Sequence, residues 1–419
     1  MTAPARIRSA LLRVLSGSAL GQGALLAASP LLARLYDEEA FGVLALVTST
    51  SAVLGAVASG GWERAVVSTR SETVARALVT LGVATSIGVG ALAAVPAGLL
   101  AGRLADVLGA PPLAGLWWLL PLTSTALGVQ RTVAVALVRR SAFGALGRRN
   151  AVQGLAQVGV ALALAPSGGP LGLALGPAVA RTLGSVGTLV RRTDRRRGVP
   201  VRVLVAVAGR SWRRAASSCA SSLVNVVGLQ APVVLLSAVF GATTVGLVAL
   251  ATRLVVSPAV VVAEAVGHVV DARLGETVRT GRPCAARQVG RSALAAAVVV
   301  VPTAAGAWAL APVAVPLLVG DGWDGLVGVV RWIVVSGAAQ SVALPVSRTL
   351  VLLHRPGAQL AWDVVRFGAT TGTLLVTATV THDPLATVAA WSLATAACYL
   401  ALVGTSIAAA RSWDSGRSA

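Results

Sequence analysis

The sequence predicts an all-α polytopic membrane protein with about twelve transmembrane helices. Hydrophobic residues make up 56% of the 419 residues, and only 12% of the residues are charged. Because a soluble domain carries roughly 25% charged residues, this chain has too little polar surface to be water-soluble. The apolar residues occur in long runs of roughly 20 residues, the length at which a helix crosses a bilayer. These runs leave little of the chain for a soluble domain.

The apolar runs place the transmembrane helices in order along the chain. Residues 10–33 follow several arginines, as the apolar part of a signal peptide does, but the run is longer than such a segment. We therefore expect an uncleaved first helix. The predicted spans are 10–33, 42–62, 75–100, 113–138, 150–166, 170–190, 212–238, 243–263, 290–313, 325–352, 358–381 and 384–410.

The distribution of arginine predicts how these helices are oriented. All 35 basic residues are arginines, and the formal net charge is +20. Most arginines, Arg148 and Arg149 among them, lie in alternate gaps between spans, whereas the other gaps are short and neutral or acidic. The positive-inside rule then places both termini in the cytoplasm. Because no nucleic-acid-binding motif accompanies this charge, we expect no nucleic-acid partner.

The chain also repeats a short pattern. Residues 41–48 read FGVLALVT and residues 245–252 read VGLVALAT, each at the opening of a span. Apolar helices can look alike by chance; the alternative is a parallel repeat whose axis follows the membrane normal. On the second interpretation we predict an N-terminal six-helix bundle at 1–190, a basic cytoplasmic linker at 191–211, a C-terminal six-helix bundle at 212–410 and a cytoplasmic tail at 411–419.

The first 70 or so residues resemble a known family in two stretches. Residues 30–42 read PLLARLYDEEAFG, and residues 62–67 read WERAVV. These are similar to the tRLYsPeeFG and YElAIv stretches of Wzx-like oligosaccharide flippases, a polysaccharide-transport family of the MATE-like MOP superfamily. Trp62 and Arg64 stand where that pattern has Tyr and Leu.

The resemblance implies a fold and an activity. The fold would be a V-shaped pair of six-helix bundles around a central cavity. The activity would be the transfer of an undecaprenyl-pyrophosphate-linked sugar between the leaflets of the bacterial cytoplasmic membrane, by alternating access, for surface polysaccharide biosynthesis. The partners would be the lipid-linked oligosaccharide, membrane lipids and other polysaccharide-assembly proteins.

Arginines inside the predicted spans are the candidate substrate contacts. An arginine at the bilayer centre costs roughly 2.5–3.5 kcal/mol, so these side chains should face the bundle interior or reach a membrane surface. The set comprises Arg131, Arg181, Arg253, Arg331, Arg348 and Arg366. The first three lie deepest and are the predicted anion-binding residues of the cavity, because guanidinium groups match phosphate oxygens in pairs. The alternative is a hydrogen bond to a backbone carbonyl or polar side chain of a neighbouring helix.

Other polar residues in the spans could line the same cavity. They are Gln22, Gln130, Asn225 and Gln340, and each could instead hold two helices together. The sequence has no catalytic constellation, no nucleotide-binding loop and no spacing of Cys or His typical of a metal site. We therefore predict a transporter without metal or cofactor rather than an enzyme. Two alternatives stay open: a multidrug exporter of the same superfamily, and a membrane enzyme of glycan assembly.

Overall fold

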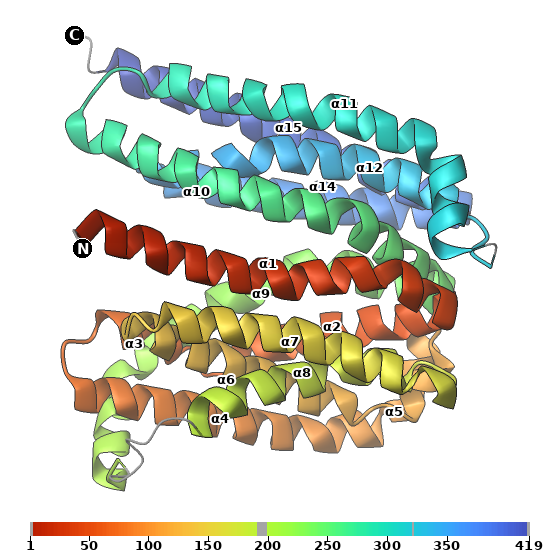
Figure 1. Cartoon of the computed structure of the whole chain (residues 1–419), viewed down its shortest axis with the longest axis horizontal. Helices are drawn as coiled ribbons and strands as arrows, with labels where there is room; N and C mark the ends of the chain where they lie inside the picture. Colours follow the sequence, from red (N-terminus) through yellow and green to blue (C-terminus); the bar gives the residue numbers. More distant parts are fainter. Residues whose placement is uncertain (1–2, 191–198, 321, 417–419) are drawn as a thin grey trace. The chain divides into compact units, whose positions relative to one another are not determined.

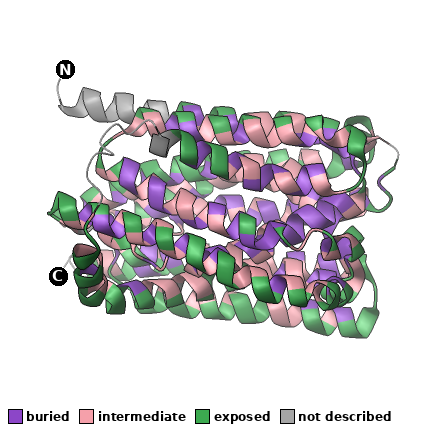
Figure 2. Cartoon of the chain, turned by 90° about the horizontal axis from the view of Figure 1, so that it is seen from below, coloured by how far each residue is buried: buried purple, intermediate pink, exposed green. Residues whose placement is uncertain are grey.

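The computed structural model describes residues 3–190, 199–320 and 322–416, and within them the chain is helical without a strand (Figure 1). The chain divides into two compact units, Met1–Gly246 and Leu247–Ala419. Six helices of the described chain are long and apolar enough to cross a membrane by length and composition, one of them a merged stretch of 80 residues. Exposed positions run along whole helices rather than only their ends, as expected where side chains meet lipid (Figure 2).

The first unit consists of long helices joined by short ones. The long helices are α1 (Ala3–Leu35), α2 (Glu38–Ala58), α4 (Glu72–Leu99), α6 (Leu119–Arg139), α7 (Phe143–Ala163), α8 (Leu171–Val190) and most of α9 (Val201–Ala251). The short ones are α3 (Glu63–Ser68), α5 (Ala101–Val107), η1 (Pro111–Ala114) and η2 (Ala165–Ser167). Helix α6 packs against α2, α3, α4 and α8, and α1 packs along α7.

The second unit begins within the last turns of α9. A π-helical turn, η3 (Thr252–Val256), leads into α10 (Ser257–Thr280), and Figure 1 shows α11 returning beside it. The remaining elements are α11 (Ala285–Val319), α12 (Leu326–Ala343), η4 (Leu344–Val346), α13 (Thr349–Leu352), α14 (Pro356–Thr381) and α15 (Pro384–Ser415). Helix α12 packs against α11 and α15, and α14 packs against α15.

The predicted fold class is confirmed, since the described residues are helical without a strand and the predicted spans fall on helical elements, with 325–352 divided among α12, η4 and α13. The count of twelve spans stays a prediction, because six helical stretches of the described chain meet the length and composition of a membrane span. Two spans, 212–238 and 243–263, share the continuous run of α9 into α10, and Gly241 separates them with φ +82° and ψ 175°. Helix α7 begins at Phe143, seven residues before the predicted span at 150. The domain boundaries at 190 and 212 stay a prediction, because residues 191–198 of the linker lie outside the described residues.

The stretch that resembles the flippase family makes structural contacts in the first unit. The Tyr36 hydroxyl donates to the carbonyl of Ala161 on α7 at 2.6 Å. The Asp37 carboxylate accepts from the amide of Ala40 at 2.8 Å and so caps the N-terminus of α2. These residues therefore join α1 to α7 and set the start of α2.

The glycines of the sequence repeat meet each other in the first unit. A Cβ atom added to Gly42 on α2 would overlap the carbonyl oxygen of Ala242, and one added to Gly246 would overlap the carbonyl oxygen of Glu38. The backbones of α2 and the last turns of α9 therefore touch, which only glycine at these points allows. The Ala242 amide also donates to the Gly109 carbonyl at 3.0 Å, which ties the same junction to the segment after α5.

We expect Gly42→Ala to lower the free energy of unfolding by about 1–3 kcal/mol, the usual range for adding a methyl group where no space exists. Unfolding of the purified protein in detergent measures this. Gly88→Ala is the matched control, because Gly88 lies inside α4 with no atom near its Cβ position. Its effect should stay within about 0.5 kcal/mol. Equal effects of the two substitutions would contradict the close approach of α2 and α9.

Candidate functional site

The first unit contains a cluster of arginines centred on Arg131. Arg131 lies on α6, and its Nη1 donates to the Gly55 carbonyl on α2 at 3.0 Å. Glu63 and Arg64, both on α3, act electrostatically on Arg131, and Arg131 acts on Arg181 of α8. We call Glu63, Arg64, Arg131 and Arg181 the Arg131 cluster. Of the predicted anion-binding residues, Arg131 and Arg181 therefore lie within electrostatic range of each other, and their role in binding stays a prediction.

The charges in the Arg131 cluster favour an anion. Its three arginines outnumber its single carboxylate, and one oxygen of Glu63 is buried without a hydrogen-bond partner among the described residues. Like charges held close together in a region of low dielectric constant repel strongly. An anion placed between them would relieve this repulsion, and each guanidinium group still has donors to offer. Arg64 was not among the predicted site residues, although it stands where the resembled pattern has Leu.

A polar network lies beside the cluster and includes a residue that sequence reasoning misplaced. The amide of Gln130 donates to Gln153 Oε1 at 3.2 Å, and Arg149 Nη1 donates to the Gln130 carbonyl at 3.1 Å. The placement of Arg149 in a gap between helices is wrong, because α7 starts early enough to carry it inside the helix, where it is only 6% exposed. Its level relative to the membrane stays a prediction. Arg149 also donates to Asn150 Oδ1, and Asn150 donates to Ser18 on α1 at 2.8 Å.

In this network the side chain of Arg149 has hydrogen-bond partners, whereas one amide atom of each glutamine has none among the described residues. Arg149 has its donors on Asn150 and a carbonyl, so it joins α1, α6 and α7. The free ends of the two glutamines, Gln130 Oε1 and Gln153 Nε2, are buried and without a partner in the described residues. A buried amide atom without a partner is costly, so these two atoms mark a point where a polar partner would be stabilising. Gln153 was not predicted, since it reads as one more polar residue in an apolar helix.

The other predicted site residues take different positions. Arg253 lies in the π-helical turn η3 of the second unit and is half-buried, so its place beside Arg131 stays a prediction. Insertions of this kind in helices are frequent at functional sites. Gln340 hydrogen-bonds Tyr399 on α15, which favours the helix-packing interpretation. Gln22 and Asn225 are exposed on α1 and α9, and their role as cavity lining also stays a prediction.

The three remaining arginines of the spans have local partners. Arg331 Nε donates to the Trp308 carbonyl at 3.3 Å, and its guanidinium lies 4.4 Å from the centre of the Trp308 ring. Arg348 pairs with Asp271 at 3.4 Å, and Arg366 lies over the ring of Trp362. Among the described residues no group of His, Cys, Asp or Glu could hold a metal ion.

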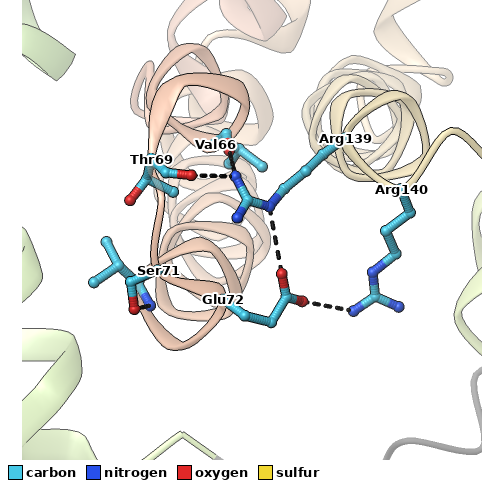
Figure 3. Close-up of polar contacts among 7 residues, drawn as sticks. Val66, Thr69, Ser71, Glu72, Arg139 and Arg140 are labelled. Carbon is cyan, nitrogen blue, oxygen red and sulfur yellow. Dashed lines mark hydrogen bonds and ion pairs between the residues drawn. The ribbon is translucent and has the colours of Figure 1, made fainter.

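Arg139 and Arg140 at the C-terminal end of α6 form, with Glu72 of α4, a set of polar contacts that we call the clasp. The clasp positions α3, and with it Glu63 and Arg64. Figure 3 shows Arg139 reaching the carbonyls of Val66 and Thr69, which end α3, while it also pairs with Glu72 of α4. The Val66 contact is 2.7 Å and the Glu72 contact 3.4 Å. Arg140 pairs with the other oxygen of Glu72 at 3.3 Å. The end of α3 is therefore fixed to α6, the helix that carries Arg131.

The comparisons with known proteins agree with this description. A model of the polysaccharide biosynthesis protein family matches residues 31–328, more than two thirds of the chain. The chain belongs to this family. In this polysaccharide biosynthesis protein the matched residues extend from the end of α1 to the start of α12. They include the Arg131 cluster and Arg253. No curated protein sequence matches the chain.

Solved structures show that this polysaccharide biosynthesis protein has the fold of the MOP superfamily. It is similar to the lipid II flippase MurJ in an inward closed conformation, with TM-score 0.75, 11% identity, and coverage of 94% of this chain and 87% of MurJ. It is also similar to an inward-facing multidrug resistance MATE transporter of the MOP superfamily, with TM-score 0.60, 15% identity, and coverage of 95% and 96%. It is similar as well to the eukaryotic MATE transporter AtDTX14, with TM-score 0.57, 14% identity, and coverage of 98% of this chain and 97% of AtDTX14.

We expect Arg139→Ala to destabilise the protein by about 1–3 kcal/mol, because it leaves two carbonyls without their charged donor and removes one of the two ion pairs of Glu72. Arg140→Ala is the control from the same clasp: its exposed ion pair should contribute no more than about 1 kcal/mol. The side chain of Arg139 is 17% exposed and that of Arg140 is 34% exposed. Unfolding in detergent compares the two variants, and a larger loss for Arg140→Ala would contradict the assigned roles.

Proposed function

We propose that the protein is a flippase that moves a polyprenyl-pyrophosphate-linked oligosaccharide across the bacterial cytoplasmic membrane for surface polysaccharide biosynthesis. The observation that carries the proposal is the Arg131 cluster, in which three arginines and one carboxylate on helices of the first unit interact electrostatically. A pyrophosphate group supplies the paired oxygens that guanidinium groups bind best. Membership of the polysaccharide biosynthesis family and the MOP fold support a lipid-linked substrate.

The proposed mechanism is alternating access of two six-helix bundles, 1–190 and 212–410. The linker 191–211, the tail 411–419 and both termini are assigned to the cytoplasm on the distribution of arginines. Arg131 and Arg181 would bind the pyrophosphate, with Arg253 as a further contact, and Gln130 with Gln153 would bind sugar hydroxyls. An inside-negative potential favours outward movement of an anion by about 2.3 kcal/mol per charge per 100 mV. Other proteins of polysaccharide assembly would supply and use the substrate.

Replacing the cluster arginines tests the anion site. We expect Arg131→Gln with Arg181→Gln to slow leaflet transfer of a pyrophosphate-linked oligosaccharide in proteoliposomes by about tenfold or more, since a hydrogen bond to a charged group contributes about 1.5–3 kcal/mol. Lysine at both positions keeps the charge without the paired donors and should give an intermediate rate. Arg253→Gln in the same assay tests the further contact.

The matched control is Arg331→Gln, an arginine of a span whose guanidinium is held by Trp308. Its transfer rate should equal that of the unmodified protein. Thermal unfolding of every variant separates loss of function from loss of fold, which matters because Arg131 also bonds to Gly55. Normal transfer by a folded Arg131→Gln, Arg181→Gln protein would overturn the anion-binding role.

Two observations bear on the alternative functions. The similarity to a multidrug resistance MATE transporter favours an exporter of organic cations, for which efflux of a cationic dye from liposomes is the test. A cation site requires a carboxylate in the interior, whereas the Arg131 cluster has one carboxylate against three arginines. A membrane enzyme of glycan assembly would instead form product from lipid-linked sugars in detergent, where no leaflets exist. Deletion of the protein followed by lipid analysis separates these cases, because a flippase defect alone accumulates the finished lipid-linked oligosaccharide in the inner leaflet.

A further inference from the structure

The second unit contains a long apolar groove between α10, α11 and α12. Its volume is about 860 Å³, and short side chains line it, mostly valine and alanine. Val262, Val266 and Val269 on α10 and Val299 on α11 are among its exposed apolar residues. Gly337 and Ser341 on α12 form part of its floor. Contact with bulk lipid does not require a groove of this kind, because lipid tails also pack against a smooth helix surface.

The groove is about as long as the hydrocarbon layer is thick. On α11 its lining runs from Arg291 to Ala307, and at 1.5 Å per residue this stretch is about 24 Å long. On the facing side it runs from Arg273 in α10 to Leu254 in η3. The hydrocarbon core of a bilayer is roughly 30 Å thick. An acyl chain of a phospholipid ends near the middle of the bilayer and would fill only about half of this length.

Only one end of the groove is charged. Arg273 and Arg291 lie at that end, close to the turn between α10 and α11, whereas Leu254, Val255 and Ala307 line the other end. Among the described residues no hydrogen bond or ion pair involves the side chain of either arginine. In the proposed orientation this end faces the cytoplasm, at the level where lipid phosphates lie. Two guanidinium groups there complement a phosphate or pyrophosphate group.

We propose that this groove holds the polyprenyl chain of the lipid-linked substrate before transfer, with Arg273 and Arg291 on its pyrophosphate in the inner leaflet. The inference rests on the proposed function and adds a loading position to it. A long isoprenoid chain is the occupant that fills the groove from end to end, and the charge at one end fits its single anionic head. In the proposed function the pyrophosphate binds the Arg131 cluster during transfer.

Neighbouring valines of α11 provide a matched test. Val299 lines the groove and is 67% exposed, whereas Val298 is 64% exposed and does not line it. We expect Val299→Trp to weaken binding of a long-chain polyprenyl diphosphate by about tenfold, because the indole occupies space that the chain would fill. Val298→Trp should change this binding less than about twofold, since that side chain is exposed outside the groove. Competitive native mass spectrometry of the purified protein in detergent measures both.

The charged end and the length of the groove need their own probes. Arg273→Gln with Arg291→Gln should also weaken binding of the polyprenyl diphosphate about tenfold. Farnesyl diphosphate, which has the same head and a short chain, should bind more weakly than the long-chain probe and should be little affected by Val299→Trp if tryptophan leaves the charged end open. Phosphatidylglycerol should not displace the long-chain probe at equal concentration.

The outcomes separate this inference from the proposed function. If folded Val299→Trp and Val298→Trp proteins bind the polyprenyl diphosphate equally well, the groove is not its binding site. That result would overturn the inference and leave the flippase proposal intact. Displacement by phosphatidylglycerol would identify the groove as a phospholipid site and also overturn the inference. Absence of binding to the unmodified protein would contradict both proposals. If Val299→Trp does not fold, Ala296→Leu is the milder substitution at the same groove wall, with the same expected direction.

Discussion

The close approach of helix backbones through glycine is the constraint on which the first unit depends. Lipid provides no hydrophobic drive between helices, so packing rests on van der Waals contact and a few hydrogen bonds. Cβ atoms at Gly17, Gly21 and Gly154 would overlap backbone atoms across the α1–α7 contact, as they would at Gly42 and Gly246. Where backbones touch in this way, Tyr36 reaches Ala161 and Ala242 reaches Gly109. The short helices and caps are then placed by these contacts.

This packing decides how charges can lie among membrane helices. Arg131 reaches the Gly55 carbonyl because α6 packs directly on α2, and Arg149 reaches the Gln130 carbonyl because α7 lies near α6. The carbonyls partly satisfy these guanidinium groups, which are expensive to bury without partners. The remaining donors and the unpaired atoms of Gln130 and Gln153 are what a ligand can use. The same packing thus stabilises the unit and leaves a polar, positively charged site in it.

The arginines of this chain serve several purposes that net charge does not distinguish. Arg139 is a structural clasp, Arg331 rests on Trp308, and Arg149 joins helices. Arg273 and Arg291 line the charged end of the groove, and the arginines of the Arg131 cluster lie beside a polar network. The two proposals use these arginines at different stages. Arg273 and Arg291 contact the pyrophosphate while the chain lies in the groove before transfer, and the Arg131 cluster binds the pyrophosphate during transfer.

The amino-acid sequence alone determined the class of this protein, the order of its helices and the positions of its deep arginines, because apolar run length and charge spacing are local properties. It predicted that Arg131 would either line a cavity or bond to a carbonyl, and only the tertiary structure decided that it bonds to the carbonyl of Gly55. It assigned Arg149 to a gap, because a helix that extends past its apolar run gives no hydropathy signal. The groove, the partners of Gln130 and the meeting of Gly42 with α9 depend on contacts between residues far apart in the chain, which hydropathy and spacing do not encode.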